Sequence, residues 1–104
     1  MAISKKGLRK ITVNQQLYVW KATSDGDGDF TISVSSSASN GQLLTSRINI
    51  ISSNGILIIT PYIVRQIILL GLANGWTDNK QKQPLAISGI IDQLDFTKAT
   101  FIGK

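Results

Sequence analysis

One segment of this 104-residue chain carries a full set of helix signals, and it limits the possible folds more than any other. The segment is residues 59–76, "ITPYIVRQIILLGLANGW". Thr60 suits the position before a helix, and Pro61 suits its first turn, where a missing N–H costs nothing. Gly75 is a typical stop, because glycine readily adopts the left-handed conformation that ends many helices. We therefore predict one helix over about residues 61–74.

The predicted helix has one apolar side, which indicates that it packs against another element. At about 100° per residue, apolar residues fall on one side, with Ile68 at its edge. The apolar side comprises Ile63, Val64, Ile67, Leu70 and Gly71, and the opposite side Arg65, Gln66, Leu69 and Ala73. Gly71 lies near the centre of the apolar side, so we expect the helix to approach a sheet closely there. Trp76 is expected to cover the helix end, with a binding role as the alternative.

The remaining segments have the character of strands, being either alternating apolar and polar or short and apolar. They span residues 10–20, 29–37, 42–51, 56–59 and 84–91. Short turns between them predict a mainly antiparallel sheet of about four to six strands. With the helix on one face, the chain is predicted to be a single α+β two-layer domain over residues 1–104, in the order β-β-β-β-(β)-α-β. A flexible basic arm is expected over residues 1–9, and residues 95–104 receive no assignment.

The first hairpin has two possible registers. A two-residue turn at Asn14 and Gln15 pairs Ile11 with Tyr18 and buries both Tyr18 and Trp20. A three-residue loop sends both aromatic rings to the other face of the sheet. We favour the first register because large aromatic side chains bury the most apolar area. Gln15 lacks the conformational freedom of the glycine that such a turn usually contains.

Composition restricts the chemistry that is open to this chain. It has no cysteine, no histidine and no glutamate, which excludes disulfides, thiolate nucleophiles, cysteine- or histidine-based zinc sites and histidine acid–base catalysis. No phosphate-binding glycine motif is present, and the chain has neither a histidine nor a local lysine–serine motif that would activate a serine as a nucleophile. We therefore predict a protein that is not an enzyme and that holds no cofactor and no metal.

The segment "DGDGDF" is similar to the start of a calcium-binding loop. An EF-hand would need glycine at the sixth position and glutamate at the twelfth, where this chain has Phe30 and Ser36. Glycines between aspartates are also ordinary in hairpin loops. We interpret Asp25, Asp27 and Asp29 as turn residues; weak divalent-ion binding, or use of these carboxylates by a hydrolase, is the alternative.

Charge and hydropathy favour a cytoplasmic location over a membrane. The net charge of +5, from 11 basic and 6 acidic residues, is ordinary for a small soluble domain. The apolar run over residues 56–72 is interrupted by polar side chains and is too polar for a membrane span. No apolar segment follows the basic residues near the N-terminus, so we predict no secretion signal.

Three motifs resemble those of a family of small uncharacterised bacterial proteins. They are Tyr18-x-Trp20 in an early hairpin, Thr60-Pro61-x-x-Val64-Arg65-x-x-Ile68 at a helix start, and Gly75-Trp76 at its end. In that family a short β-meander precedes one helix and a final strand. The resemblance therefore implies this fold over about residues 10–90. It implies no activity and no site residue.

We place the predicted function on the sheet face that the helix leaves uncovered. The candidate partner-binding residues there are Thr31, Ser33, Thr45, Arg47 and Asn49, with Thr12 on the same face. A flat polar surface suits protein recognition better than it suits a substrate pocket. We predict a small protein-interaction module that uses this face or a sheet edge, with a protein partner or a second copy; plain solvation of the hydroxyls is the alternative.

The basic residues near the N-terminus support a second hypothesis, a weak electrostatic nucleic-acid binder. Its candidate contacts are Lys5, Lys6, Arg9 and Lys10. Contacts of this kind with phosphates are sensitive to salt and independent of base sequence. A solvated terminus without a ligand explains the same residues.

Overall fold

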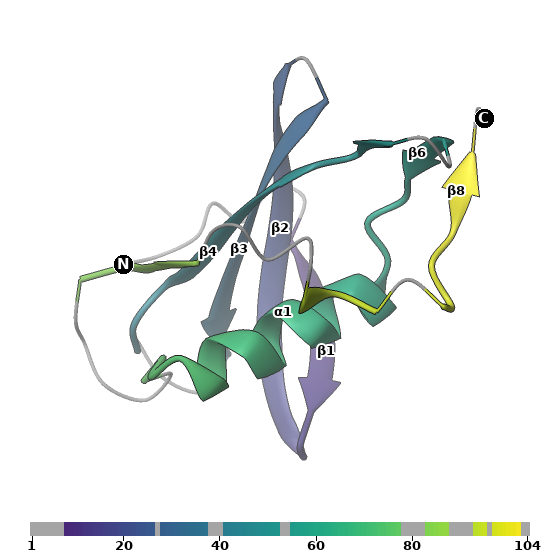
Figure 1. The fold of residues 1–104 in the computed structure, drawn as a ribbon. Helices are drawn as coiled ribbons and strands as arrows, with labels where there is room; N and C mark the ends of the chain where they lie inside the picture. Colours follow the sequence, from purple (N-terminus) through teal and green to yellow (C-terminus); the bar gives the residue numbers. More distant parts are fainter. Residues whose placement is uncertain are drawn as a thin grey trace.

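Over the residues that the computed structural model describes, the chain forms two sheets and one α-helix (Figure 1). These residues are 8–26, 28–37, 41–52, 55–77, 83–87, 93–95 and 97–102. The elements are β1 (Arg9–Val13), β2 (Gln16–Gly26), β3 (Asp29–Ser36), β4 (Leu44–Asn49), β5 (Ile51–Ser52), β6 (Gly55–Leu57), α1 (Pro61–Ala73), β7 (Leu85–Ile87) and β8 (Phe101–Ile102).

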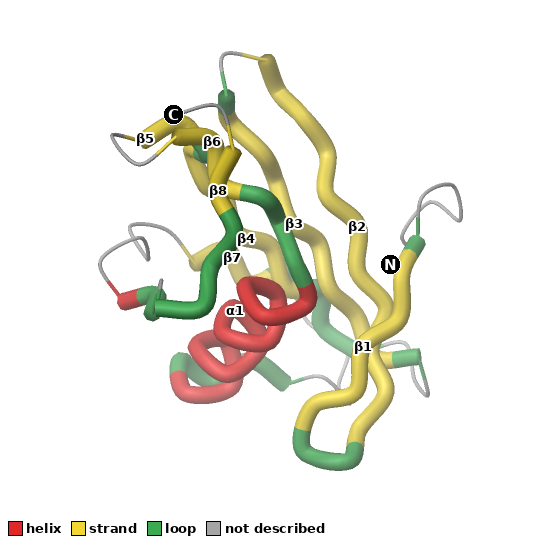
Figure 2. Tube along the Cα trace, turned by 90° about the vertical axis from the view of Figure 1, so that its right-hand side faces the viewer, coloured by secondary structure: helices red, strands yellow, loops and turns green. Residues whose placement is uncertain are grey.

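The main sheet has five strands in the order β1-β2-β3-β4-β7. Strands β1 to β4 form an antiparallel meander, because short connections join each to the next. Strand β7 follows α1 in the chain and pairs parallel with β4. The helix lies against one face of this sheet (Figure 2). The predicted α+β two-layer fold with a mainly antiparallel sheet is therefore confirmed.

A second, smaller sheet in the order β5-β6-β8 was not predicted. The segment expected to form a strand at residues 56–59 supplies β6, which belongs to this sheet and not to the main one. Residues 95–104, left without an assignment, contain β8, which pairs with β6. Ile51, Ile56 and Ile102 are direct cross-strand neighbours and are 60%, 38% and 56% exposed. A row of this size is ordinary for a protein surface.

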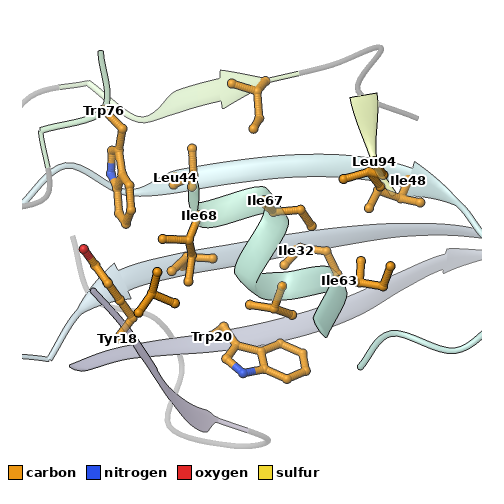
Figure 3. Packing of buried hydrophobic residues seen from close by; sticks show 14 of the residues in the cluster. Tyr18, Trp20, Ile32, Leu44, Ile48, Ile63, Ile67, Ile68, Trp76 and Leu94 are labelled. Carbon is orange, nitrogen blue, oxygen red and sulfur yellow. The ribbon is translucent and has the colours of Figure 1, made fainter. Parts of the chain in front are cut away.

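Side chains of the helix and the main sheet share one apolar core (Figure 3). The helix contributes Ile63, Val64, Ile67 and Ile68, all fully buried. Ile68 is thus more central than predicted and Leu70, which is half-buried, is less so. Gly71 confirms the expected close approach, because a Cβ there would lie 2.6 Å from Cδ2 of the buried Leu44.

The two ends of α1 differ in how well the sequence predicts them. Thr60 precedes the helix and its carbonyl accepts a hydrogen bond from the Val64 N–H at 3.0 Å. The predicted position of Thr60 is thus confirmed, although its side chain makes no capping hydrogen bond. At the other end Gly75 is left-handed, with φ of 91°. The Trp76 N–H donates to the Gly71 carbonyl at 2.9 Å, which completes the expected glycine stop.

The first hairpin has the register that burial of the aromatic residues favoured. Ile11 pairs with Tyr18, and Tyr18 and Trp20 are 2% and 4% exposed. The turn residues Asn14 and Gln15 have φ of 53° and 67°. Left-handed geometry at both positions is that of a type I′ turn, whose twist matches the twist of the strands.

Replacing Gln15 by glycine is expected to raise the free energy of unfolding by about 0.5–1 kcal/mol. A left-handed residue with a Cβ costs about 1–2 kcal/mol, whereas glycine costs about 0.5–1 kcal/mol in chain entropy. Urea denaturation of the variant and the parent measures the difference. Gln15→Ala keeps the Cβ and is the matched control, so equal stabilities of the glycine and alanine variants would contradict the expected strain.

Candidate functional site: the open face of the main sheet

The five candidate partner-binding residues lie together on the sheet face opposite α1. Side chains alternate along β3 and β4, and those that point toward the helix include the buried Ile32, Val34, Leu44, Ser46 and Ile48. The alternate positions hold Thr31, Ser33, Thr45, Arg47 and Asn49, which are half-buried or exposed. Cross-strand pairing sets Thr31 beside Arg47 and Ser33 beside Thr45. We call this surface the open face.

Strand β2 continues the open face with residues that were not predicted to belong to it. Thr23 pairs with Thr31, and Lys21 pairs with Ser33. Two rows of polar side chains therefore cross three strands, Thr23–Thr31–Arg47 and Lys21–Ser33–Thr45. Lys21 could have been found from the sequence, because it has the same parity along β2 as Val19, away from the buried Tyr18 and Trp20.

Asp29 organises one corner of the open face. Its carboxylate accepts a hydrogen bond from Arg47 Nη2 at 3.2 Å and another from Asn49 Nδ2 at 3.0 Å. The Asn49 Oδ1 in turn accepts the Ile51 N–H at 2.9 Å. The Arg47 side chain is 63% exposed, so this ion pair orients the guanidinium more than it stabilises the fold.

The structure does not support the calcium interpretation at Asp29, because this carboxylate faces Arg47 and Asn49. The side chain of Asp25 and the whole of Asp27 lie outside the described residues. Within the described part of the chain, no three carboxylates, histidines or cysteines come together as a metal site would require.

Of the four basic residues near the N-terminus, the two that the structure describes, Arg9 and Lys10, lie on different faces of the sheet. Lys5 and Lys6 lie outside the described residues, and Arg9 belongs to β1, which corrects the predicted arm over residues 1–9. Arg9 and Lys10 are neighbours in a strand and point to opposite faces. The Arg9 Cζ lies 5.9 Å from the centroid of the Trp20 ring, on the helix side, whereas Lys10 extends the open face.

The outer side of α1 carries contacts that fasten the C-terminal segment. Gln66 donates to the Asp95 carbonyl at 2.9 Å and accepts the Asp95 N–H at 2.6 Å. Hydrogen bonds from Thr97 lower the pKa of Asp95, while loss of solvation, followed by the charge of Asp95, raises the pKa of Tyr62. Gln66, Leu69, Leu70 and Gln93 line an open hollow of about 240 Å³ nearby. These groups hold the chain in place on the side away from the open face.

None of the helices formed by the described residues has the length and apolar character that a bilayer span requires. Membership of the bacterial family suggested by the three motifs stays a prediction. When it is compared with profiles of protein families, with curated proteins and with solved structures, the chain matches none of them.

Proposed function

We propose that this chain is a small cytoplasmic bacterial interaction module, not an enzyme, that binds a protein partner through the open face. The observation that carries the proposal is the pair of polar rows, Thr23–Thr31–Arg47 and Lys21–Ser33–Thr45, which run unbroken across three strands. Small molecules are bound mostly in concave sites, whereas protein partners meet flatter surfaces with spaced polar groups.

The chemistry of the rows suits recognition of another protein. Each hydroxyl of Thr31, Ser33 and Thr45 can both donate and accept a hydrogen bond. Arg47 is held in place by Asp29, so less side-chain freedom is lost when a partner binds it. Arginine is also among the residues that contribute most to binding at protein interfaces.

The proposal is tested by affinity capture from bacterial lysate with the parent chain and with Ser33→Arg, which places a bulky charge at the centre of the open face. Ala73→Arg introduces the same side chain on the exposed side of α1 and is the matched control. A partner retained by the parent and the control, and reduced about tenfold by Ser33→Arg, would support the open face. Partners retained equally by all three proteins would rule that face out.

The alternative, a weak electrostatic nucleic-acid binder, has less support from the structure. Sheets that bind single strands stack bases on exposed aromatic rings, and here Tyr18 and Trp20 are buried against α1. Arg9 and Lys10 also point to different faces. Titration with short DNA and RNA at about 50 and about 200 mM salt tests it, since binding through phosphates would weaken steeply between the two concentrations.

A further inference from the structure

Within the described residues, the outer edge of β1 is not paired with another strand, and this strand carries the two cations Arg9 and Lys10. Resting on the function proposed above, we propose that the partner contributes an acidic, extended segment that adds to this edge as a further strand of the main sheet. Pairing through the backbone would fix the segment in place, and its side chains would extend from β1 onto the open face.

The hairpin register determines which backbone groups of β1 point outward. Val13 and Gln16 flank the two-residue turn and exchange hydrogen bonds, and bonded pairs then alternate along the hairpin. Lys10 and Thr12 fall at the non-bonded positions, so their N–H and C=O groups point away from β2. Leu17, the partner of Thr12, shows the same alternation, because its carbonyl turns to β3 and accepts the Ser37 N–H at 3.1 Å.

Strand β1 is terminal in the main sheet, and no strand within the described residues pairs with its outer side. Its five residues match the length of an ordinary strand, long enough to pair with a short extended segment. A sheet edge with outward N–H and C=O groups is a template for an added strand. The other terminal strand, β7, has three residues and offers a shorter template.

Charge identifies the kind of segment that fits this edge. Residues 9–24 contain three cations, Arg9, Lys10 and Lys21, and no carboxylate. Lys10 lies opposite Val19 on the open face, so Lys21 is its diagonal neighbour there. Arg9 lies on the other face of β1. A strand added beside β1 would therefore meet positive charge on both of its faces, which favours glutamate and aspartate in that strand.

The same charges argue against a second copy of this chain as the occupant. Antiparallel pairing of β1 with β1 of another copy would bring two Lys10 side chains to one face and two Arg9 side chains to the other. Like charges close together across strands are unfavourable, and lysine on an edge strand is a common means of preventing self-association. An acidic segment changes this repulsion into attraction.

The test uses a short capped peptide in which pairs of glutamates alternate with pairs of valines, so that glutamate lies on both faces of the strand, added to the intact ¹⁵N-labelled chain. We expect the Lys10 and Thr12 amide protons to become about tenfold more protected from exchange when the peptide is bound. The same peptide N-methylated at every residue keeps every charge and has no backbone N–H left to donate to β1. We expect it to bind about tenfold more weakly, and a peptide with lysine for glutamate not to bind.

Two pairs of variants separate backbone pairing from charge. Thr12→Pro removes one outward N–H that β2 does not use, and Thr12→Val keeps it; only the proline variant should bind the peptide about threefold to tenfold more weakly. Lys10→Glu should weaken binding by at least as much. Arg65→Glu makes the same charge change on the exposed side of α1 and should leave binding nearly unchanged. Unchanged spectra for β3 and β4 confirm that each variant is folded.

Several outcomes would overturn the inference. Simple electrostatic attraction would be shown if the N-methylated peptide bound as tightly as the parent peptide, or if Thr12→Pro bound the peptide as tightly as the parent chain. The same protection pattern with a DNA oligonucleotide would also show it. Absence of peptide binding would also reject it. Shifts at Thr31 and Ser33 without protection at Thr12 would reject the edge and favour the open face. The proposed function fails on a different result, a captured partner that Ser33→Arg still retains.

Discussion

Replacing Trp76 by alanine is expected to lower the free energy of unfolding by about 3–5 kcal/mol, the range for removing a buried aromatic side chain. Trp76 is 4% exposed. Its ring packs against Tyr18, with 5.4 Å between ring centroids (Figure 3). Its Nε1–H donates to the Gln42 carbonyl at 2.7 Å. The alanine variant therefore leaves a cavity and also an acceptor without its donor.

Urea denaturation of the parent, Trp76→Ala and Trp76→Phe measures these two contributions. Phenylalanine keeps most of the ring and loses the indole N–H, so it should cost less, about 1–3 kcal/mol. A loss below about 1 kcal/mol for the alanine variant would show that the ring is only a surface cover. If Trp76→Phe binds the glutamate–valine peptide with the parent affinity, Trp76 takes no part in binding at the β1 edge. A loss of affinity would instead support a binding role for Trp76.

The parts of the fold that follow from local chemistry could be predicted from the sequence. Pro61 marks the start of the helix because proline has a fixed φ that suits the first helical turn. Gly75 marks its end because glycine readily adopts the left-handed conformation. The hairpin register followed from the area that Tyr18 and Trp20 bury, a large effect that overrides the poor fit of Gln15 to its turn. At the helix the local preferences and the core agreed, whereas at the hairpin the core outweighed the preference of Gln15.

The second sheet could not be predicted because its strands are too short to show a period. Strand β8 has two residues and depends on contacts distant in sequence, namely pairing with β6 and the hydrogen bonds between Gln66 and Asp95. Thr60 shows another limit. Its residue type favours a capping side chain, yet tertiary packing leaves its Oγ1 buried without a partner.

The open face was predicted in part, because alternation assigns a side chain to a face with no knowledge of its neighbours. That was enough for the residues of β3 and β4. Asp29 stands where the predicted turn meets the strand predicted over residues 29–37, and nothing in the sequence indicates its ion pair with Arg47, eighteen residues later. Arg9 was grouped with the other basic residues, although strand alternation separates it from Lys10. The order of strands in a sheet, and the residue at which a strand begins, depend on contacts between residues that are far apart in the sequence.

Gln42 was not singled out in the sequence, and it holds together three segments that converge near Trp76. Its Nε2 donates to the Gln83 carbonyl at 2.7 Å. Its Oε1 accepts the Thr77 N–H at 2.9 Å and the Thr77 hydroxyl at 3.1 Å. Gln42 is 8% exposed, so water has little access to replace these bonds. The side chain thus joins the segment before β4, the segment after α1 and the segment before β7.

Replacing Gln42 by leucine, which is similar in size, is expected to lower the free energy of unfolding by about 2–4 kcal/mol. The loss arises because the Thr77 N–H and the Gln83 carbonyl would remain partly buried without partners, and each such group costs about 1–3 kcal/mol. Gln16→Leu is the matched control. Gln16 makes one longer bond, 3.3 Å to Ser36 Oγ, and its replacement should cost less than about 1 kcal/mol.

Amide exchange gives the local measurement for the same variant. Leu85 of β7 donates its N–H to the Leu43 carbonyl at 2.8 Å, next to Gln42. In Gln42→Leu the protection of Leu85 should fall more than that of Ile11 in β1, which lies at the other edge of the sheet. Equal losses at both edges would mean that Gln42 contributes to global stability alone. A selective loss at Leu85 would show that this buried amide is what attaches the parallel strand to the antiparallel meander.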